Sequence, residues 1–473
     1  CKCAPVAERI VFGLYGSAES FDKAIFFMLN HAADLRIVPK FPGSDILYKY
    51  NHLFELRFIW GARVNFEIPN TPEGVFVSDM VFIILSDILV WGMFFFSHNF
   101  IIFSFTEVKD STINNSIKSL DRKVKLAIDD AYQRIFKFHS LQKFKNISYT
   151  DNYKNKIDYK YLPLESIAIY VPGSTASYPS SVLMTAIPAI VAGVKRIVMI
   201  NPGYKGKQNP AVLYAAKRCK IKEIYSIGGP SAIAAVAYGT KKIKPVNKIV
   251  GPGNAFVAAA KKEVFGDVGI ESMSAGPSEV LIVSDHSSNP EWLASDLIGQ
   301  AEHDILAQCI LISKDKNILQ QTAREIYKQL KKIPRSSIAA KSLKNNGILM
   351  YVKSDKKILE IINKVGPEHC ELNVKNYKSL IPKIKSAGSI CFGKYAVMAM
   401  TDYGVPGSNH VLPTNTSSKY SSGLNVSEFM KKISYINLSK KGIETLGPSV
   451  ITLANYEGLA GHAISVKKRI RRK

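Results

Sequence analysis

The sequence contains few cysteines. It has six, Cys1, Cys3, Cys219, Cys309, Cys370 and Cys391, in 473 residues. So few and so dispersed, they exclude a disulfide framework and are typical of a protein kept in a reducing compartment. Cys1 and Cys3 form a C-x-C pair, but no second pair is present to complete a zinc site, so we interpret them as structural or incidental.

Acidic residues are also scarce: 38 Asp and Glu stand against 63 Lys and Arg, which gives a formal charge of +25. Such a charge often marks a protein that binds nucleic acid. Here the lysines are scattered, and the one dense block, residues 467–473, has no aromatic residues between its charges for base stacking. We therefore predict no nucleic-acid partner and interpret the block as a solvated basic tail on an enzyme that handles an anionic cofactor.

A long uninterrupted apolar run is missing as well. Residues 81–105 come closest, but Asp87 and the sequence Ser97, His98, Asn99 interrupt them, and no secretory signal is present. We expect a cytoplasmic or organellar protein without membrane attachment, although a membrane span, buried strands and a non-native junction all remain open for this stretch. The first residue is Cys rather than Met, which favours a fragment, a processed form or a faulty gene model. Residues 1–105 are predicted as an atypical N-terminal segment of unknown role.

Regular patterns begin near Ile113. Residues 113–144 have apolar side chains at helical spacing, and the runs ESIAIYV, RIVMI, EIYSIGG, KIVG and EVLIVSD then alternate with helix-like sequence. Strands that alternate with helices predict parallel sheets covered on both faces. Residues 421–473 have a helical character of their own, with a helix predicted from the Gly-Pro at 447–448, and are expected to form an arm.

The run KIVGPGNAFVAAAKKEVFG places a glycine turn between a short strand and an Ala-rich helix. Asn254 is positioned to cap this helix, and its free backbone N–H groups favour an anion such as phosphate. A tight strand-to-helix connection would look the same. The dinucleotide signature G-x-G-x-x-G is absent from this turn, which argues against an ordinary Rossmann site.

Two further motifs combine imidazole with oxygen ligands. In ASDLIGQAEHD, Gln300 and His303 lie three positions apart on a predicted helix, where both side chains reach one ion. In GPEHCEL, Glu368 and His369 follow a proline, and such a pair can divide acid and base roles. A packed helical histidine and a surface Glu-His pair are the alternatives.

The loop TDYGVPGSNHVLP supplies Asp402 and His410 and is rich in Gly and Pro, as functional loops often are. Glu457 and His462 are five residues apart, about 140° around a helix, so they meet one ligand only if Gly461 bends the chain or the ligand is long. Four of the five histidines after residue 140 fall in these motifs. Together with one Gln and one Asp, they suggest a zinc or similar transition-metal site.

Taken in order, these motifs resemble those of the histidinol dehydrogenase family. The resemblance covers about residues 113–473 through YVPGSTASYPSSVLMTAIPAIVAGVKRIVMINP, VGPGNAFVAAAKKEVFGDVG, AGPSEVLIVSD, GQAEHD, GPEHCEL, AGSICFG, DYGVPGSNHVLPT and YSSGLNVSEF. It implies an α/β fold with two incomplete Rossmann-like lobes around a cleft and a C-terminal helical arm. On this basis we expect a two-lobed core at residues 106–420 and an arm at residues 421–473 that contributes to the partner subunit's site.

The resemblance also implies the reaction, which is the zinc-dependent oxidation of L-histidinol to L-histidine through L-histidinaldehyde. Two NAD are reduced in succession, in the last step of histidine biosynthesis. His369 is expected to act as the base in the alcohol step, and Glu368 to activate water for the aldehyde step. The expected zinc ligands are Gln300, His303, Asp402 and His462. The expected substrate contacts are Ser278, Gln300, His303, His369, Asp402, His410, Glu457 and His462.

For NAD, the resemblance points to Tyr170, Asn254 and Ser231. Ser231 stands where the family has a glutamine, and this change is expected to weaken cofactor binding. Ser174 stands where a second glycine is usual, and this change is expected to add local strain if the backbone there needs a positive φ. The family forms a homodimer with shared active sites, so dimerisation is expected to be required for activity. The competing hypotheses are a dehydrogenase for another zinc-bound alcohol, such as a sulfonated or hydroxylated diol, and a non-catalytic or membrane-tethered relative.

Overall fold

The computed structural model describes residues 53–57, 63–67, 106–173, 177–204, 206–271, 276–395 and 397–470. The chain divides into two compact units, Cys1–Gly92 and Met93–Lys473. In the first unit, β1 (Leu53–Arg57) and β2 (Arg63–Glu67) form an antiparallel hairpin. Cys1, Cys3, Ser174 and the apolar stretch at 81–105 lie outside the described residues.

The second unit contains a first lobe built on a six-stranded sheet. Its order is β10 (Gly269–Ile270), β9 (Lys248–Val250), β6 (Ser166–Tyr170), β7 (Arg196–Ile200), β8 (Glu223–Ser226) and β3 (Thr106–Glu107). All neighbours are parallel except β3, which is antiparallel to β8. The helices of this lobe are α4 (Asp110–Lys118), α5 (Arg122–Ser140), α6 (Pro179–Ala192), α7 (Pro210–Arg218), α8 (Gly229–Tyr238) and α9 (Ala255–Glu263).

The central strand β6 shows why both faces of this sheet are covered. Every residue of its sequence SIAIY is buried. Ile167 and Ile169 belong to one hydrophobic cluster, whereas Ala168 and Tyr170 belong to another on the opposite face. Alternate side chains of a strand point to opposite faces, so an all-apolar strand requires a helical layer on each side.

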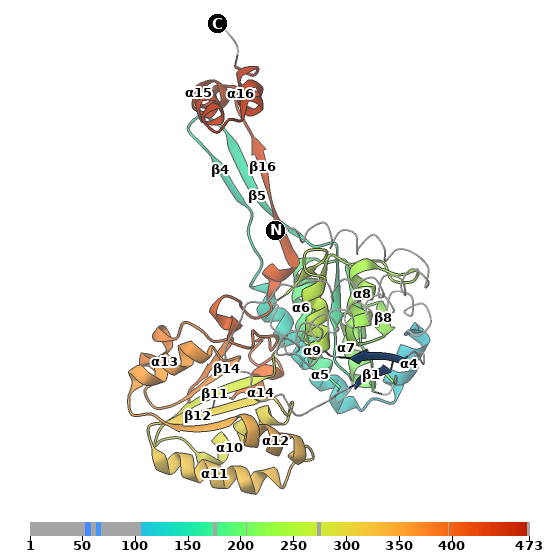
Figure 1. Cartoon of the computed structure of the whole chain (residues 1–473), viewed down its shortest axis with the longest axis vertical. Coiled ribbons are helices and arrows are strands. Elements are labelled where there is room, and N and C mark those ends of the chain that lie inside the picture. Colours follow the sequence, from blue (N-terminus) through green and yellow to red (C-terminus); the bar gives the residue numbers. More distant parts are fainter. Residues whose placement is uncertain are drawn as a thin grey trace. The chain divides into compact units, whose positions relative to one another are not determined.

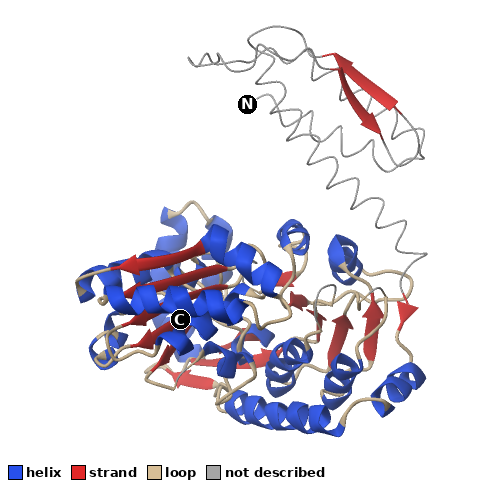
Figure 2. Ribbon diagram, turned by 90° about the horizontal axis from the view of Figure 1, so that it is seen from below, coloured by secondary structure: helices blue, strands red, loops and turns tan. Residues whose placement is uncertain are grey.

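The second lobe repeats this design with a fully parallel sheet. Its order is β13 (Gly347–Tyr351), β12 (Gln308–Ser313), β11 (Glu279–Ser284), β14 (His369–Asn373) and β15 (Ser389–Phe392). Its helices are α10 (Pro290–Ala301), α11 (Lys316–Leu330), α12 (Ser336–Asn346), α13 (Asp355–Val365) and the short α14 (Met398–Asp402). Figure 2 shows helices on both sides of its strands. Val280 and Ile282 pack into one cluster and Leu281 and Val283 into the other, as in β6.

An arm extends from the first lobe (Figure 1). Its stem is an antiparallel sheet of β16 (Met430–Asn437), β5 (Lys156–Pro163) and β4 (Ile147–Thr150). Helices α15 (Lys440–Tyr456) and α16 (Ala460–Lys467) pack against each other at its end. Phe429, just before β16, is fully buried in the core of the first lobe and anchors the base of the arm.

Three details of local structure differ from the sequence prediction. The helix predicted over residues 113–144 is two helices, because Asp121 starts α5 by accepting a hydrogen bond from the backbone N–H of Lys123. The last helix is also two, broken at Gly458 with φ +76° rather than bent at Gly461, and Pro448 lies inside α15 instead of at its start. The strand β16 before these helices was not predicted.

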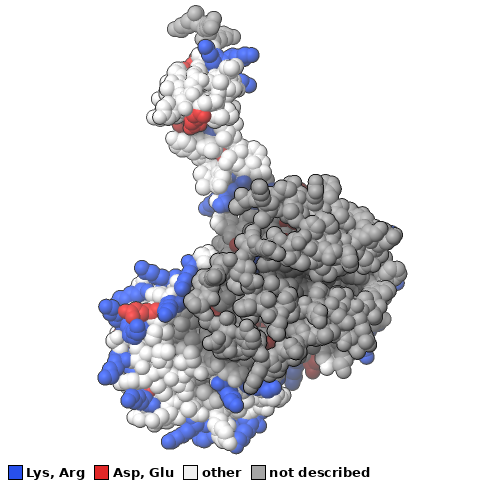
Figure 3. Space-filling model, in the orientation of Figure 1, with Lys and Arg blue, Asp and Glu red and all other residues white. Residues whose placement is uncertain are grey.

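None of the helices in the described residues is long and apolar enough to cross a membrane. On the face of the molecule drawn in Figure 3, Lys and Arg side chains lie at many separate places on the described surface, over the second lobe and at the end of the arm.

Candidate active site

The catalytic candidates lie where two neighbouring strands of the second lobe begin. Ser278 directly precedes β11, and Glu368 directly precedes β14, whose first residue is His369. The strands are parallel and adjacent, with Val280 paired to His369. The amino ends of adjacent parallel strands meet at the same sheet edge, so the register brings the three side chains together although about ninety residues separate them in the chain.

Glu368 and His369 form the centre of the site. Only 7% of Glu368 and 3% of His369 are exposed. The Glu368 Oε2 accepts a hydrogen bond of 2.9 Å from the backbone N–H of Glu279, and its Oε1 lies 4.0 Å from His369 Nε2. Burial raises the pKa of Glu368 well above its ordinary value, and the nearby carboxyl groups of Asp402 and Glu279 add to this effect.

His369 is held in its neutral form. Burial, together with the neighbouring imidazoles of His410 and His303, lowers its pKa to about 3. Its Nδ1 has no hydrogen-bond partner in the described part of the chain, whereas its Nε2 lies 3.7 Å from Asp402 Oδ1. A neutral imidazole keeps a lone pair on one ring nitrogen, which is the form that a general base requires.

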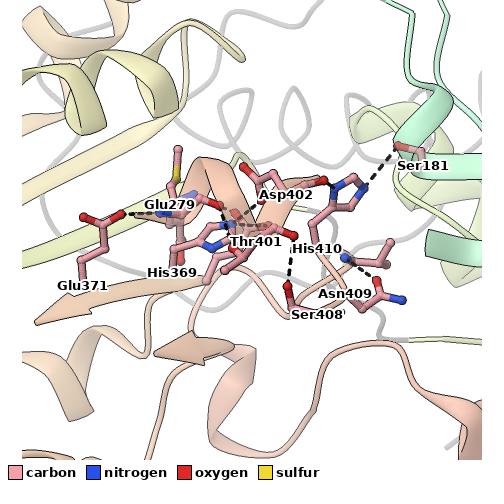
Figure 4. Close-up of polar contacts among 12 residues, drawn as sticks. Ser181, Glu279, His369, Glu371, Thr401, Asp402, Ser408, Asn409 and His410 are labelled. Carbon is pink, nitrogen blue, oxygen red and sulfur yellow. Dashed lines mark hydrogen bonds and ion pairs between the residues drawn. The ribbon is translucent and has the colours of Figure 1, made fainter. Parts of the chain in front are cut away.

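Asp402 and His410 come from the short helix α14 and the loop after it, and Figure 4 shows them close to His369. The His410 Nδ1 lies 2.8 Å from the carbonyl oxygen of Asp402, which fixes that nitrogen as the donor and leaves Nε2 as the acceptor. Nε2 lies 3.5 Å from the hydroxyl oxygen of Ser181 in the first lobe. Burial raises the pKa of Asp402 to about 7 and lowers that of His410 to about 4.

Gln300 lies in α10, and His303 lies just after this helix. Gln300 is 1% exposed, and its Nε2 has no hydrogen-bond partner among the described residues. His303 is exposed, and its imidazole contributes to lowering the pKa of both His369 and His410. The two residues do not share a helix face as predicted, because α10 ends at Ala301 and His303 lies in the turn that follows.

The cofactor candidates lie at the carboxyl edge of the first sheet. Tyr170 ends β6, and its hydroxyl accepts a hydrogen bond of 3.1 Å from the backbone N–H of Gly229, at the start of α8, the helix that carries Ser231. Asn254 caps α9 as predicted, its Oδ1 accepting from the Val257 N–H. Gly251 has φ +111°, and a Cβ there would lie 2.3 Å from the Tyr170 carbonyl oxygen, so only glycine fits this position.

Glu457 and His462 are not among these groups. Both are exposed and lie near the junction of α15 and α16, at the end of the arm. Because the chain reverses at Gly458, their five-residue spacing is not that of one continuous helix. The described residues contain no cluster of three or more His, Cys, Asp or Glu that would hold a metal ion.

Sequence reasoning missed three residues that build this site. Glu371 is 1% exposed, and its Oε1 accepts a hydrogen bond of 2.7 Å from the Met398 N–H, which anchors the start of α14 and hence Asp402 (Figure 4). Lys261 and Glu271 form a buried ion pair beside Gly251. The period-two spacing of His369 and Glu371 on one strand was a usable signal for Glu371.

A cavity of about 130 Å³ joins the two halves of the site. It is lined by Gly251 and Gly253 of the glycine turn and by Ser278, Glu368 and His410. The glycine turn before α9, which is suited to phosphate, thus lines the same space as the buried Glu368. Two α/β lobes with these groups at one cavity are consistent with the class of nicotinamide-nucleotide-dependent dehydrogenases.

Comparisons with known proteins identify the family. A family model for histidinol dehydrogenase matches residues 96–470. The chain is 78% identical over 361 residues to histidinol dehydrogenase of Pelagibacter ubique, covering 76% of this chain and 84% of that one. It is 48% identical over 348 residues to histidinol dehydrogenase 1 of Trichormus variabilis, covering 74% and 80%. A crystal structure of histidinol dehydrogenase from Elizabethkingia anophelis matches with a TM-score of 0.74 at 36% identity, over 83% of this chain and 92% of that one.

The chain belongs to the histidinol dehydrogenase family. This confirms the family and the fold class predicted from the sequence. It also confirms the predicted enzyme class, an NAD-dependent oxidoreductase of histidine biosynthesis.

Proposed function

We propose that this chain oxidises L-histidinol to L-histidine through L-histidinaldehyde at the cavity described above, with zinc in the site. The observation that carries the proposal is the convergence of Ser278, Glu368 and His410 with the glycine turn on one cavity. His369 takes the alcohol proton while hydride leaves for the first NAD. Glu368 then takes a proton from the water that attacks the aldehyde, and a second hydride leaves for the second NAD.

The donor set suits zinc. Gln300, His303 and Asp402 offer an amide oxygen, an imidazole nitrogen and a carboxylate oxygen, and His462 of a second copy would complete the set. The raised pKa of Asp402 is what a buried carboxylate shows when no cation lies nearby. When bound, zinc would hold the substrate's nitrogen atoms and polarise its oxygen. Ser278, His410 and Glu457 of the second copy would contact the rest of the substrate.

The cofactor turn suits NAD. The backbone at Gly251 and Gly253 leaves no space for a side chain, and the N-terminus of α9 favours the pyrophosphate. Tyr170, Ser231 and Asn254 border this turn in our proposal. Ser231 replaces the family's longer amide, and its hydroxyl reaches the cofactor through water.

We propose that the active enzyme is a homodimer in which each arm enters the partner's site. The arm has many exposed large apolar side chains: Ile147, Tyr149, Ile157, Ile433, Tyr435, Ile436, Leu438, Leu446, Val450, Leu453, Tyr456, Leu459 and Ile464. Surface of this kind is typical of an interface. An apolar groove of about 480 Å³ lined by Ile135, Pro179, Leu183, Met184 and Tyr403 borders the site near Ser181 and Asp402 and would receive it.

Stoichiometry and metal removal test the reaction. Purified protein given limiting L-histidinol and excess NAD is expected to form two NADH per histidinol. Chelation is expected to abolish turnover, because the substrate then loses its anchor and its polarising cation, and added zinc is expected to restore it. Zinc-loaded dimer that forms no NADH from histidinol would contradict the proposed substrate. One NADH per histidinol would contradict the proposed second step.

Mixed dimers test the shared site. His462→Ala disables the arm and leaves the core intact, whereas His369→Asn disables the core and leaves the arm intact. Each variant alone is expected to be inactive. After co-refolding, random pairing places one intact site in half of the dimers, so about a quarter of wild-type activity is expected to return. Sedimentation of the wild-type chain as an active monomer, or no recovery from dimers shown to be mixed, would refute the shared site.

A further inference from the structure

The segment around the glycine turn has the layout of a nucleotide-binding unit. Strand β9 leads into Gly251, helix α9 follows, and β10 returns parallel to β9 and ends one residue before Glu271. Glu271 lies twenty positions after Gly251. In dinucleotide-binding folds, an acidic residue about 20 residues after the glycine turn, at the end of the second strand, binds the ribose hydroxyls.

Glu271 is tied to the turn through one oxygen only. Its Oε1 accepts hydrogen bonds from the Gly251 N–H at 2.8 Å and from Lys261 Nζ at 2.7 Å. Lys261 Nζ also donates to the Gly251 carbonyl oxygen, at 2.5 Å. The ion pair therefore binds both the backbone N–H and the carbonyl oxygen of Gly251 and holds the turn in its unusual backbone conformation.

The second carboxylate oxygen of Glu271, Oε2, makes no hydrogen bond to the turn. The side chain is only 9% exposed and that of Lys261 only 7%, yet Oε2 has no hydrogen-bond partner among the described residues. An unpartnered buried carboxylate oxygen is costly unless a ligand donates to it. Glu271, Lys261 and Gly251 all line the cavity that also contains Ser278 and Glu368. Glu271 thus contributes to the wall of this cavity and carries a buried oxygen without a hydrogen-bond partner among the described residues.

We propose that Glu271 Oε2 accepts hydrogen bonds from the adenosine ribose of the bound cofactor and so makes the site select NAD over NADP. This inference rests on the proposed function, since it concerns the cofactor of that reaction. A carboxylate at this place attracts the 2′-hydroxyl and repels a 2′-phosphate. The ion pair with Lys261 keeps the Glu271 carboxylate oriented while its Oε1 holds the turn.

Cofactor binding to the full-length protein tests this, measured by fluorescence titration with NADH, NADPH and 2′-deoxy-NADH. Glu271→Gln retains an acceptor for the Gly251 N–H but lacks the charge, and Glu263→Gln on the exposed face of α9 is the matched control. Wild type is expected to prefer NADH to NADPH. Glu271→Gln is expected to weaken NADH binding by about 10-fold or more, the effect of one hydrogen bond to a charged group. The same variant is also expected to reduce the ratio of NADH affinity to NADPH affinity. The Glu263→Gln control is expected to change neither the NADH affinity nor this ratio.

The 2′-deoxy cofactor separates ribose binding from mere support of the turn. Wild-type protein is expected to bind 2′-deoxy-NADH more weakly than NADH, whereas Glu271→Gln is expected to bind the two equally. The reason is that removing the 2′-hydroxyl and replacing Glu271 abolish the same hydrogen bond. An equal loss in both proteins, or an unchanged NADH preference in the variant, would overturn the inference and leave Glu271 as a clamp. Should Glu271→Gln fail to fold, the double variant Lys261→Met with Glu271→Met removes both buried charges and permits the same comparison. Wild-type protein that binds neither NADH nor NADPH would instead refute the proposed function.

Discussion

Replacing His369 by asparagine is expected to slow both oxidation steps by about 10²–10⁴-fold, the usual contribution of a general base. Asparagine has a similar size but cannot take up a proton at any working pH. His369 is suited to the role because burial keeps it neutral and its ring faces the carboxyl groups of Asp402 and Glu368. Initial rates of NADH formation with L-histidinol and, separately, with L-histidinaldehyde measure the two steps.

The matched control is His286→Asn. His286 is an exposed histidine that follows β11, at the opposite end of the strand from Ser278. This variant is expected to retain wild-type rates with both substrates. Undiminished oxidation of either substrate by a folded, zinc-loaded His369→Asn dimer would show that another group accepts the proton in that step.

Replacing Glu368 by glutamine is expected to stall mainly the aldehyde step, again by about 10²–10⁴-fold. Glutamine keeps an oxygen for the backbone N–H of Glu279, so the local structure is retained while the base is lost. A carboxylate whose pKa is raised by burial is a stronger base toward water than an exposed one. In our proposal the alcohol step uses His369, so the rate of that step is expected to change far less.

A single turnover with L-histidinol separates the two steps for the glutamine variant. One NADH per site in a fast phase, with little second NADH, is the expected result, and Glu360→Gln on the exposed face of α13 is the control. Equal slowing of both phases would contradict the division of labour between Glu368 and His369. Activity with L-histidinaldehyde equal to that of wild type would exclude Glu368 as the base for water.

The sequence predicted much of the core because its signals are local. The strands of ESIAIYV, RIVMI, EIYSIGG, KIVG and EVLIVSD all form, as β6, β7, β8, β9 and β11. Short apolar runs bounded by turn residues predict strands reliably where a sheet is buried on both faces. The Asn254 cap also forms, because it depends only on a side chain and the backbone three residues later. Helix ends were missed, as were the strands outside these five runs; among them, β16 is largely exposed and so has no strong apolar pattern.

By itself, the sequence determined the α/β class, the family motifs and the residues that carry the proposed chemistry, because residue type and short-range spacing encode them. Only the tertiary structure decided which of these residues meet. Parallel pairing of β11 with β14 brings Ser278 to Glu368 and His369, and the Glu371 hydrogen bond to Met398 positions α14 and hence Asp402. Only the fold shows that Lys261 and Glu271 hold the glycine turn at Gly251. These contacts join distant segments through strand register and burial, which no local pattern specifies.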